Sequence, residues 1–244
     1  MTTMNMINIR KTIICIAAAA VAAVSCQKDD TLQYNNLTMG NIVEGRFVSD
    51  QGHIFNIVDQ ICPGELGKEK RTMVLCDVLN QTDGGTEDEY DVRLTNFSRV
   101  LDKDAVALEN AMEGDLAVQN PIHIEQLWFS GGYINMMITY NAKIGSETKH
   151  LVNLVYSKDE QGRYVLNLRH NAFGEVWTEE NASKMMTGSS YVSFPITKFV
   201  KEDNAKLVFK WKWHKDVGSR FDYLFEKEYS FEFDWKRSGF EHKF

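Results

Sequence analysis

The stretch from Glu226 to Lys236, EKEYSFEFDWK, alternates large aromatic side chains with polar or charged ones from Tyr229 to its end. The stretch from Lys206 to His214, KLVFKWKWH, repeats the pattern. A period of two places the aromatic residues of a strand on one face and the charged residues on the other. Both stretches are therefore predicted to be β-strands of an antiparallel sheet that buries one face. We expect cross-strand ion pairs between their charged faces.

Shorter runs of the same alternation, broken by Gly, Asn and Asp, recur between residues 38 and 115. They predict strands at Gly40–Val48, Ile54–Gln60, Met73–Leu79 and Tyr90–Phe97. The one helix candidate in this part is Asp104–Met112. Four or five strands over about 75 residues suit a small, partly open barrel of the OB type.

Residues 119 to 244 hold 23 of the 28 aromatic residues, including all five Trp, so this part should have the larger core. In addition to the two aromatic strands, it is predicted to contain a short helical turn at Thr178–Met186 and four strands: Ile122–Phe129, Tyr133–Tyr140, Leu151–Tyr156 and Tyr164–His170. Such a set describes an antiparallel β-sandwich. The predicted fold is mainly β, with an OB-like barrel at 38–115 followed by a β-sandwich at 119–244.

The beginning of the chain predicts a lipid anchor. An apolar run of twelve residues, Ile13–Val24, follows a short basic start and is too short to cross a bilayer as a helix. Residues 1–25 are therefore interpreted as a signal peptide. Ser25 followed by Cys26 is typical of a bacterial lipoprotein processing site, so we expect Cys26 to carry lipid at the start of an acylated tether, residues 26–37. The alternative is an ordinary signal cleavage next to an unmodified Cys26.

Four residues after the predicted lipid site resemble the short acidic tag of Bacteroidota lipoproteins that reach the cell surface: Gln27, Lys28, Asp29 and Asp30. The alternative is a charged, solvated tether without an address. With the tag, the sequence predicts an outer-membrane lipoprotein exposed at the cell surface of a bacterium. The periplasmic side of that membrane stays open as an alternative.

Charge excludes nucleic acid as a partner of the barrel. Residues 38–115 carry seven basic and sixteen acidic side chains, a net charge of −9. Single-stranded nucleic acid requires a basic groove with aromatic stacking platforms. The barrel has only four aromatic residues, and its charge would repel phosphate groups.

Cysteine usage leaves two alternatives open. Cys15 is predicted to leave with the signal peptide, so Cys62 and Cys76 remain as a pair in an oxidising compartment. They could form a disulfide or stay as two free core thiols. No C-x-x-C motif is present, and Pro63 and Gly64 directly follow Cys62, which argues against a redox site.

No pattern of catalytic or metal-binding residues is recognisable. A G-x-S-x-G elbow is absent, and the six histidines are scattered singly. His123 and Glu125 share a strand face, which could place two zinc ligands together. We favour a solvated polar face over a zinc site as the interpretation of this pair. An acidic loop lacks the spacing of a calcium loop and is interpreted as hydrated: Asp83, Glu87, Asp88, Glu89 and Asp91. We therefore predict no catalytic residues, no metal and no cofactor, with a hydrolase as the residual alternative.

The most unusual polar cluster is Arg169, His170 and Asn171, which stands before Gly174 at a predicted strand end. Its structural interpretation is a strand terminated by Asn-x-x-Gly, with Arg169 paired to an acid. A ligand contact is the alternative.

Three segments resemble the NigD-like lipoproteins: GNIVEGRFVSD at 40–50, GYIN at 132–135 and LRHNAFGE at 168–175. The resemblance covers the anchor and both domains. It implies an OB-like first domain followed by a β-sandwich. The founding member of the family was named from a bacteriocin gene cluster and proposed as an immunity protein. The resemblance brings no functional residues with it.

These observations predict a non-enzymatic, lipid-anchored envelope protein that binds another protein, with bacteriocin immunity as one form of that role. The alternative is a glycan-binding accessory protein, because sugar rings stack on exposed aromatic side chains. Solvent exposure of the five tryptophan side chains decides between the two roles: Trp128, Trp177, Trp211, Trp213 and Trp235.

Overall fold

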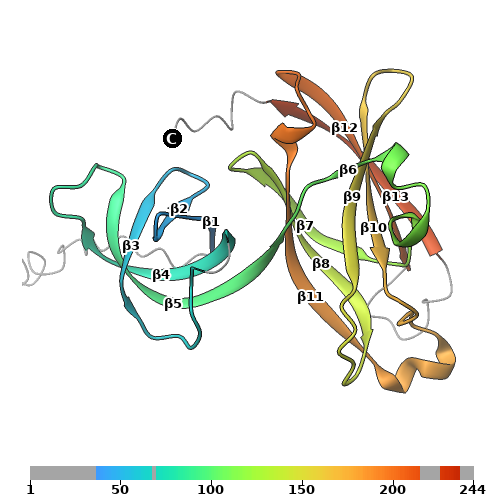
Figure 1. Ribbon diagram of the computed structural model, residues 1–244, viewed down its shortest axis with the longest axis horizontal. Helices are drawn as coiled ribbons and strands as arrows, with labels where there is room; N and C mark the ends of the chain where they lie inside the picture. Colours follow the sequence, from blue (N-terminus) through green and yellow to red (C-terminus); the bar gives the residue numbers. More distant parts are fainter. Residues whose placement is uncertain (1–36, 68–69, 215–225, 237–244) are drawn as a thin grey trace, which may run out of the picture. The chain divides into compact units, whose positions relative to one another are not determined.

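The computed structural model describes residues 37–67, 70–214 and 226–236 (Figure 1). The predicted signal peptide, lipid site Cys26 and acidic tag Gln27–Asp30 lie outside these residues. All described residues belong to one compact unit of the chain. No helix within the described ranges has the length and apolar character needed to span a membrane.

Five strands of the N-terminal part close into a barrel: β1 (Thr38–Val43), β2 (Arg46–Ser49), β3 (Ile54–Gln60), β4 (Arg71–Gln81) and β5 (Glu89–Asp102). Antiparallel pairing joins β3 to β2, β2 to β1, β1 to β4 and β4 to β5, and a parallel pair of β3 with β5 completes the ring. Its small core contains Phe47, Phe55, Val74, Cys76, Val78, Val92 and Leu94. The barrel thus has five strands, within the four or five expected from the sequence.

The prediction of one strand over Gly40–Val48 was wrong, because the chain reverses between β1 and β2. Glu44 and Gly45 have φ angles of +51° and +80°. Two successive residues with positive φ form the tight hairpin turn whose twist matches that of the flanking strands. Apolar residues on both sides of this turn continue the alternation and conceal it.

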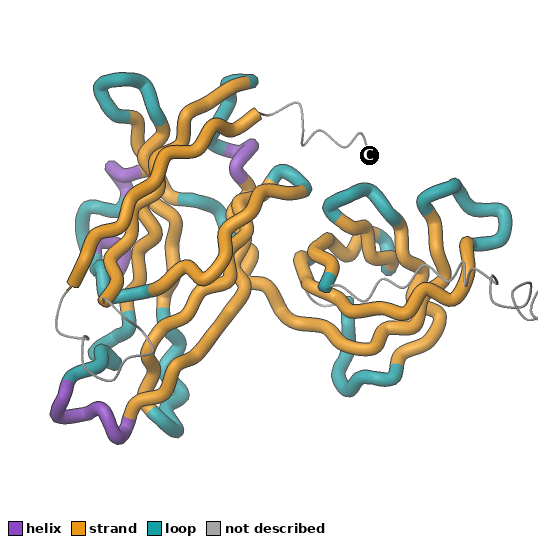
Figure 2. The backbone as a smooth tube through the Cα atoms, turned by 180° about the vertical axis from the view of Figure 1, so that it is seen from behind, coloured by secondary structure: helices purple, strands orange, loops and turns teal. Residues whose placement is uncertain are grey.

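The described residues of the C-terminal part form eight strands and four short 3₁₀ helices. The strands are β6 (Val106–Ala107), β7 (His123–Ser130), β8 (Tyr133–Lys143), β9 (Leu151–Lys158), β10 (Tyr164–Asn171), β11 (Met185–Pro195), β12 (Asn204–His214) and β13 (Glu226–Lys236). The helices are η1 (Leu108–Asn110), η2 (Gly114–Ala117), η3 (Glu179–Lys184) and η4 (Ile196–Lys198). Strands dominate and the helical turns are short in Figure 2.

Two sheets form the sandwich. One continues from the barrel in the order β3-β2-β1-β4-β5-β11-β8-β7, and the other has the order β13-β12-β10-β9-β6. Between them lies a core of sixteen buried residues, including Ile134, Met136, Leu154, Leu166 and Phe209. The larger core therefore lies in the aromatic-rich part, as the sequence indicates. Parallel pairs, such as β10 with β12, occur beside the antiparallel ones.

Strand β11 joins the two parts and was not predicted. It pairs with β8 along its whole length and, through Tyr191 to Ser193, with the end of β5 in parallel. Its first half, MMTGSS, contains Gly and Ser and lacks the alternation that marks the other strands. Pairing partners on both sides therefore determine the strand where the local pattern does not.

The predicted helix at Asp104–Met112 was also wrong. This segment forms β6, which pairs in parallel with β9, followed by the single turn η1. No side chain caps the η1 turn. The residues before it, Val106 and Ala107, are held by pairing with β9 rather than by helical hydrogen bonds. Residues 106–107 thus belong to the five-stranded sheet of the sandwich.

The two aromatic strands pair as predicted. β12 and β13 are antiparallel neighbours, with Phe209 opposite Phe231 and Trp211 opposite Tyr229. Lys212 stands opposite Glu228 in the same register. Oppositely charged residues of the two strands are therefore cross-strand neighbours, as the expected ion pairs require.

Candidate binding site

A buried ion pair lies where the barrel meets the sandwich. Arg71, the first residue of β4, and Asp50, just after β2, have side chains that are 0% and 1% exposed. Nη1 of Arg71 donates to Oδ1 of Asp50 at 2.9 Å and Nη2 donates to Oδ2 at 2.7 Å. This bidentate geometry is the strongest arrangement for a guanidinium and a carboxylate.

Residues of the sandwich satisfy the remaining hydrogen-bonding groups of the pair. Arg71 donates through Nη2 to Oδ1 of Asn135 at 2.8 Å and through Nε to Oγ of Ser193 at 2.9 Å. Ser193 donates to Asn135, Asn135 to Ser130, and Ser130 to Oδ2 of Asp50. The network therefore closes on itself across the two parts, and we call these five residues the junction network.

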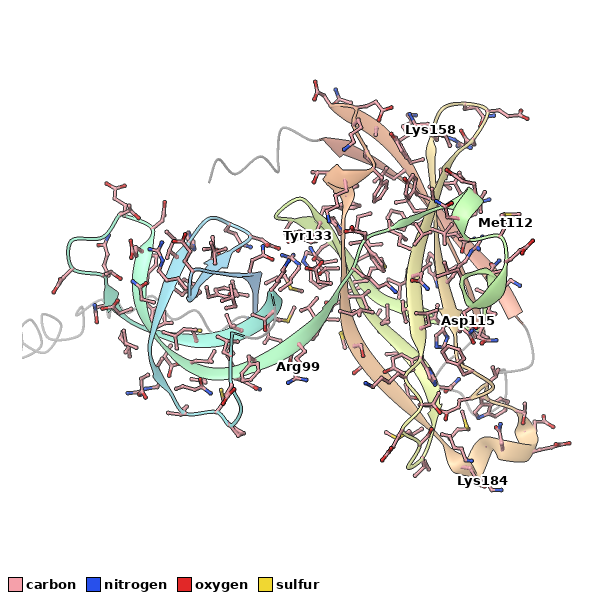
Figure 3. The ribbon with its side chains drawn as sticks, viewed as in Figure 1. Arg99, Met112, Asp115, Tyr133, Lys158 and Lys184 are labelled. Carbon is pink, nitrogen blue, oxygen red and sulfur yellow. The ribbon has the colours of Figure 1, made fainter. Side chains whose placement is uncertain are left out.

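The ring of Tyr133 covers the guanidinium of Arg71. The distance from Cζ of Arg71 to the ring centroid is 3.9 Å, and Figure 3 labels Tyr133 at the start of β8. A cation over an aromatic face is attracted by the negative face of the ring, and more strongly when both are shielded from water. Burial is the main cause that raises the pKa of the Tyr133 hydroxyl.

Gly131, in the turn between β7 and β8, is required by the close approach of Asp50. Its φ angle is +56°, and a Cβ atom at this position would lie 2.3 Å from Oδ1 of Asp50. Any side chain here would collide with the buried carboxylate. The junction network therefore depends on a glycine as well as on its polar members.

A pocket of about 560 Å³, which we call the junction pocket, opens beside this network. Its lining comes from β1, β4 and the β2–β3 turn of the barrel, and from β7 and β11 of the sandwich: Leu37, Thr38, Met39, Gln51, His53, Met73, Gln126, Trp128, Phe129, Ser130 and Tyr191. Ser130 belongs to both the pocket and the junction network. The contacts that join the two parts thus also fix the walls of the pocket.

The junction pocket combines apolar walls with a neutral polar rim. Trp128 and Tyr191 are half-buried and pack against the buried residues Met39, Met73 and Val100. Gln51 and Gln126 are exposed at the rim. None of the eleven lining residues is Asp, Glu, Lys or Arg. Such a lining suits binding of an uncharged ligand.

A second cluster, which we call the histidine relay, connects His170, His150 and Glu175. Nδ1 of His170 lies 2.9 Å from the carbonyl oxygen of Pro121, and Nε2 lies 3.0 Å from Nδ1 of His150. Nε2 of His150 is 3.3 Å from Oε2 of Glu175. The side chains of His150 and Glu175 are only 4% and 10% exposed.

Hydrogen-bond chemistry determines where the protons of the relay lie. The Pro121 carbonyl only accepts, so His170 donates to it through Nδ1. Burial lowers the pKa of His170 to about 4, so at pH 7 its Nε2 accepts from His150. Hydrogen bonds from Ser146 and from the backbone N–H of Lys143 lower the pKa of Glu175 to about 2. Nδ1 of His150 therefore donates to Nε2 of His170, and Nε2 of His150 faces the carboxylate of Glu175.

The Arg169-His170-Asn171 cluster is thus structural in each of its three contacts. Nη1 of Arg169 donates to the carbonyl oxygens of Ala111 and Leu116, not to the acid that we expected. Nδ2 of Asn171 donates to Asp115, on the same segment. Figure 3 labels Asp115 on this segment, beside β10. Arg169 and Asn171, on one face of β10, bind residues 106–117 to the sheet, and His170, on the opposite face, binds Pro121.

Other sequence candidates are spread over the molecule. Nε2 of His123 is 3.8 Å from Oε2 of Glu125, and burial lowers the pKa of His123. Cys76 lies in the barrel core and Cys62 packs against it, and burial raises the pKa of the Cys76 thiol to about 12. A disulfide between them stays a prediction.

The acidic loop uses its oxygens internally. Asp91 accepts hydrogen bonds from Thr82 and Asn80, which lower its pKa, and Glu89 accepts from Asn56. Within the described ranges, no three His, Cys, Asp or Glu side chains gather in a group that could hold a metal ion.

The tryptophans divide by their surroundings. Trp128, Trp177 and Trp211 are half-buried, whereas the side chains of Trp213 and Trp235 lie outside the described part. Of the three tryptophan side chains that the structure describes, Trp128 alone lines the junction pocket. Sequence reasoning named Trp128 as a glycan candidate but missed the rest of the pocket, because its lining comes from five separate segments without a common motif.

Comparison with known proteins gives a family and a fold. The profile of the NigD-like C-terminal beta sandwich domain matches residues 104–226. No curated protein matches the chain.

Several solved structures share the fold. A NigD-like immunity protein from Bacteroides caccae has 15% identity and a TM-score of 0.55, with 83% of this chain and 96% of that chain covered. A protein from Bacteroides fragilis named "putative lipoprotein" has 15% identity and a TM-score of 0.50, with 80% and 94% covered. A protein of unknown function from Bacteroides vulgatus has 18% identity and a TM-score of 0.53, with 81% and 90% covered.

Proposed function

The chain belongs to the NigD-like family, and from this premise we propose that it is a lipid-anchored, non-enzymatic binding protein of the bacterial envelope whose ligand enters the junction pocket. The observation that carries the proposal is the pocket itself. It is about 560 Å³ in volume, within the range of ligand sites, and buried contacts hold its walls.

A binding role fits the chemistry of the lining better than a catalytic one. His53 is the one lining residue of a type that commonly serves as a general base. Nε2 of His53 lies 3.8 Å from Oδ1 of Asp88, and its ring lies beside the rings of Phe55 and Tyr90. The histidine relay resembles a catalytic arrangement more closely, but its polar atoms face one another and the Pro121 carbonyl.

The anchor is proposed from the sequence at Ser25 and Cys26 and is supported by the name of the fold neighbour from Bacteroides fragilis. Leu37, which lines the pocket, follows Cys26 by eleven residues. A chain of this length spans at most about 40 Å. The pocket would therefore be presented close to the membrane, on the outer membrane and, with the acidic tag, at the cell surface.

The name of one fold neighbour, an immunity protein, makes another protein one candidate partner class, beside the glycan that the uncharged lining favours. Trp, Tyr and Met are enriched at the centres of protein interfaces, and Trp128, Tyr191, Met39 and Met73 contribute these types here. In this version, a side chain of the partner, such as a bacteriocin, would fill the junction pocket. A glycan is the second candidate, favoured by the uncharged lining.

Capture experiments test the site whichever class binds. The chain from residue 27 onward would be immobilised and exposed to envelope extracts, with Trp128→Ala compared against Trp177→Ala. Trp177 is also half-buried but lies outside the pocket, so it controls for loss of a tryptophan. We expect Trp128→Ala to lose the captured partner and Trp177→Ala to keep it. Equal capture by both variants, with both folded, would refute the pocket as the site.

A further inference from the structure

The junction pocket lacks formal charge although its surroundings are rich in it. Charged residues make up 25% of the chain, but the eleven lining residues contain no Asp, Glu, Lys or Arg. Its polar groups are hydroxyls, side-chain amides and one imidazole, from Thr38, Ser130, Gln51, Gln126 and His53. Hydroxyl and amide groups can both donate and accept hydrogen bonds, although the hydroxyl of Ser130 already donates to Asp50.

This lining disfavours charged ligands of either sign. A phosphate, sulfate or carboxylate group would find no cation in the walls, and residues 38–115, which include the barrel, carry a net charge of −9. A cationic ligand would find no carboxylate in the lining. Desolvating a charge without a partner is costly, so a neutral ligand is favoured.

The two aromatic side chains supply flat apolar surfaces beside the polar groups. Trp128 extends from β7 and Tyr191 from β11, and both rest on Met39, Met73 and Val100. Because these supports are buried, the rings are held before any ligand arrives. Exposed amides at Gln51 and Gln126 stand at the rim. The pocket therefore offers an apolar platform bordered by neutral hydrogen-bonding groups.

We infer that the junction pocket binds a neutral saccharide, with a sugar ring stacked on Trp128 and its hydroxyl groups bonded by the rim amides Gln51 and Gln126. A sugar ring has a face of C–H groups and an edge of hydroxyls, which match this platform and this rim. The inference rests on the proposed function, since it names the ligand class of the same pocket.

A glycan array tests the ligand class directly. The immobilised probes are neutral hexose and N-acetylhexosamine oligosaccharides, each matched by uronic acid-containing oligosaccharides of equal length. We expect binding to a subset of the neutral probes and at least tenfold weaker binding to their acidic counterparts. Equal binding to neutral and acidic probes, or binding to none, would overturn the inference.

Variants then assign the contacts. Trp128→Ala should weaken binding of the best neutral probe about tenfold, and Trp128→Phe should restore part of it by keeping a stacking surface. Gln126→Ala, an exposed position that folding should tolerate, should weaken it about three- to tenfold through the loss of hydrogen bonds. Trp177→Ala serves as the control. Unchanged affinity in both Trp128→Ala and Gln126→Ala would also overturn the inference.

The envelope capture described above separates this inference from the proposed function. If the captured partner depends on Trp128 but survives enzymatic deglycosylation and periodate oxidation, then the ligand is a protein. In that case the saccharide inference is wrong and the pocket remains the binding site. If capture is independent of Trp128, the proposed site itself is wrong.

Discussion

Replacing Arg71 with Met should destabilise the protein strongly, because it leaves Asp50 as an unpaired charge inside the molecule. The two side chains are 0% and 1% exposed, so water cannot replace the lost partner. Four hydrogen bonds from Arg71 to Asp50, Asn135 and Ser193 disappear with the guanidinium. Breaking a buried ion pair by removing one partner costs about 3–5 kcal/mol.

A surface pair provides the matched control. Arg93 donates to Asp59 at 2.7 Å, the same distance as the shorter Arg71 contact, but these side chains are 42% and 46% exposed. Arg93→Met should therefore cost about 0–1 kcal/mol. The difference between the two variants therefore measures the effect of burial, since an ion pair is lost in both.

Urea unfolding of the chain from residue 27 onward, followed by tryptophan fluorescence, measures both free energies of unfolding. In thermal unfolding, Arg71→Met should lower Tm by about 6–20 °C, since each kcal/mol shifts Tm by about 2–4 °C at this size. If the losses in free energy of unfolding of Arg71→Met and Arg93→Met differ by less than about 1 kcal/mol, which is close to experimental error, then the junction network does not stabilise the protein as argued.

Three further predictions concern separate features. Because burial lowers the pKa of His170 to about 4, the unfolded chain binds a proton between pH 6.5 and 4 that the folded chain excludes. The free energy of unfolding should fall by about 3 kcal/mol as pH decreases through this window, and urea titrations of His170→Gln should show a flatter profile. Gly131→Ala should destabilise by at least about 1 kcal/mol more than Gly145→Ala in the same assay, since both have positive φ but only Gly131 meets Asp50. Equal losses in the two variants would contradict that steric argument. Metabolic labelling with palmitate should mark the parent protein and not Cys26→Ala, and equal labelling would contradict the proposed anchor.

The sequence predicts strands well where the alternation is strong. β3 and β13 have the bounds expected for them, and β12 and β13 pair in the expected antiparallel direction. β11 was missed because Gly188 and its neighbouring serines carry no apolar signal, although the strand lies between β5 and β8. In that position, hydrogen bonds to two neighbours determine the conformation whatever the local propensity.

The candidate site was harder to predict than the fold. Arg71 and Asp50 stand at the ends of two strands, with no sequence spacing that relates them to Asn135 or Ser193. Their pairing follows from the barrel meeting the sandwich, which only the topology provides. The Arg169-His170-Asn171 cluster, in contrast, was visible as unusual. Its alternating contacts, outward from Arg169 and inward from His170, follow from the period of the strand on which they lie.

Fluorine NMR of the chain labelled with 5-fluorotryptophan would test most directly whether the ligand occupies the junction pocket. Each of the five resonances can be assigned by single Trp→Phe substitution. On addition of the partner captured from envelope extract, we predict that the Trp128 resonance shifts while the Trp177 resonance stays in place. A shift at Trp177 or another tryptophan, with Trp128 unchanged, would contradict the assignment of the pocket as the binding site.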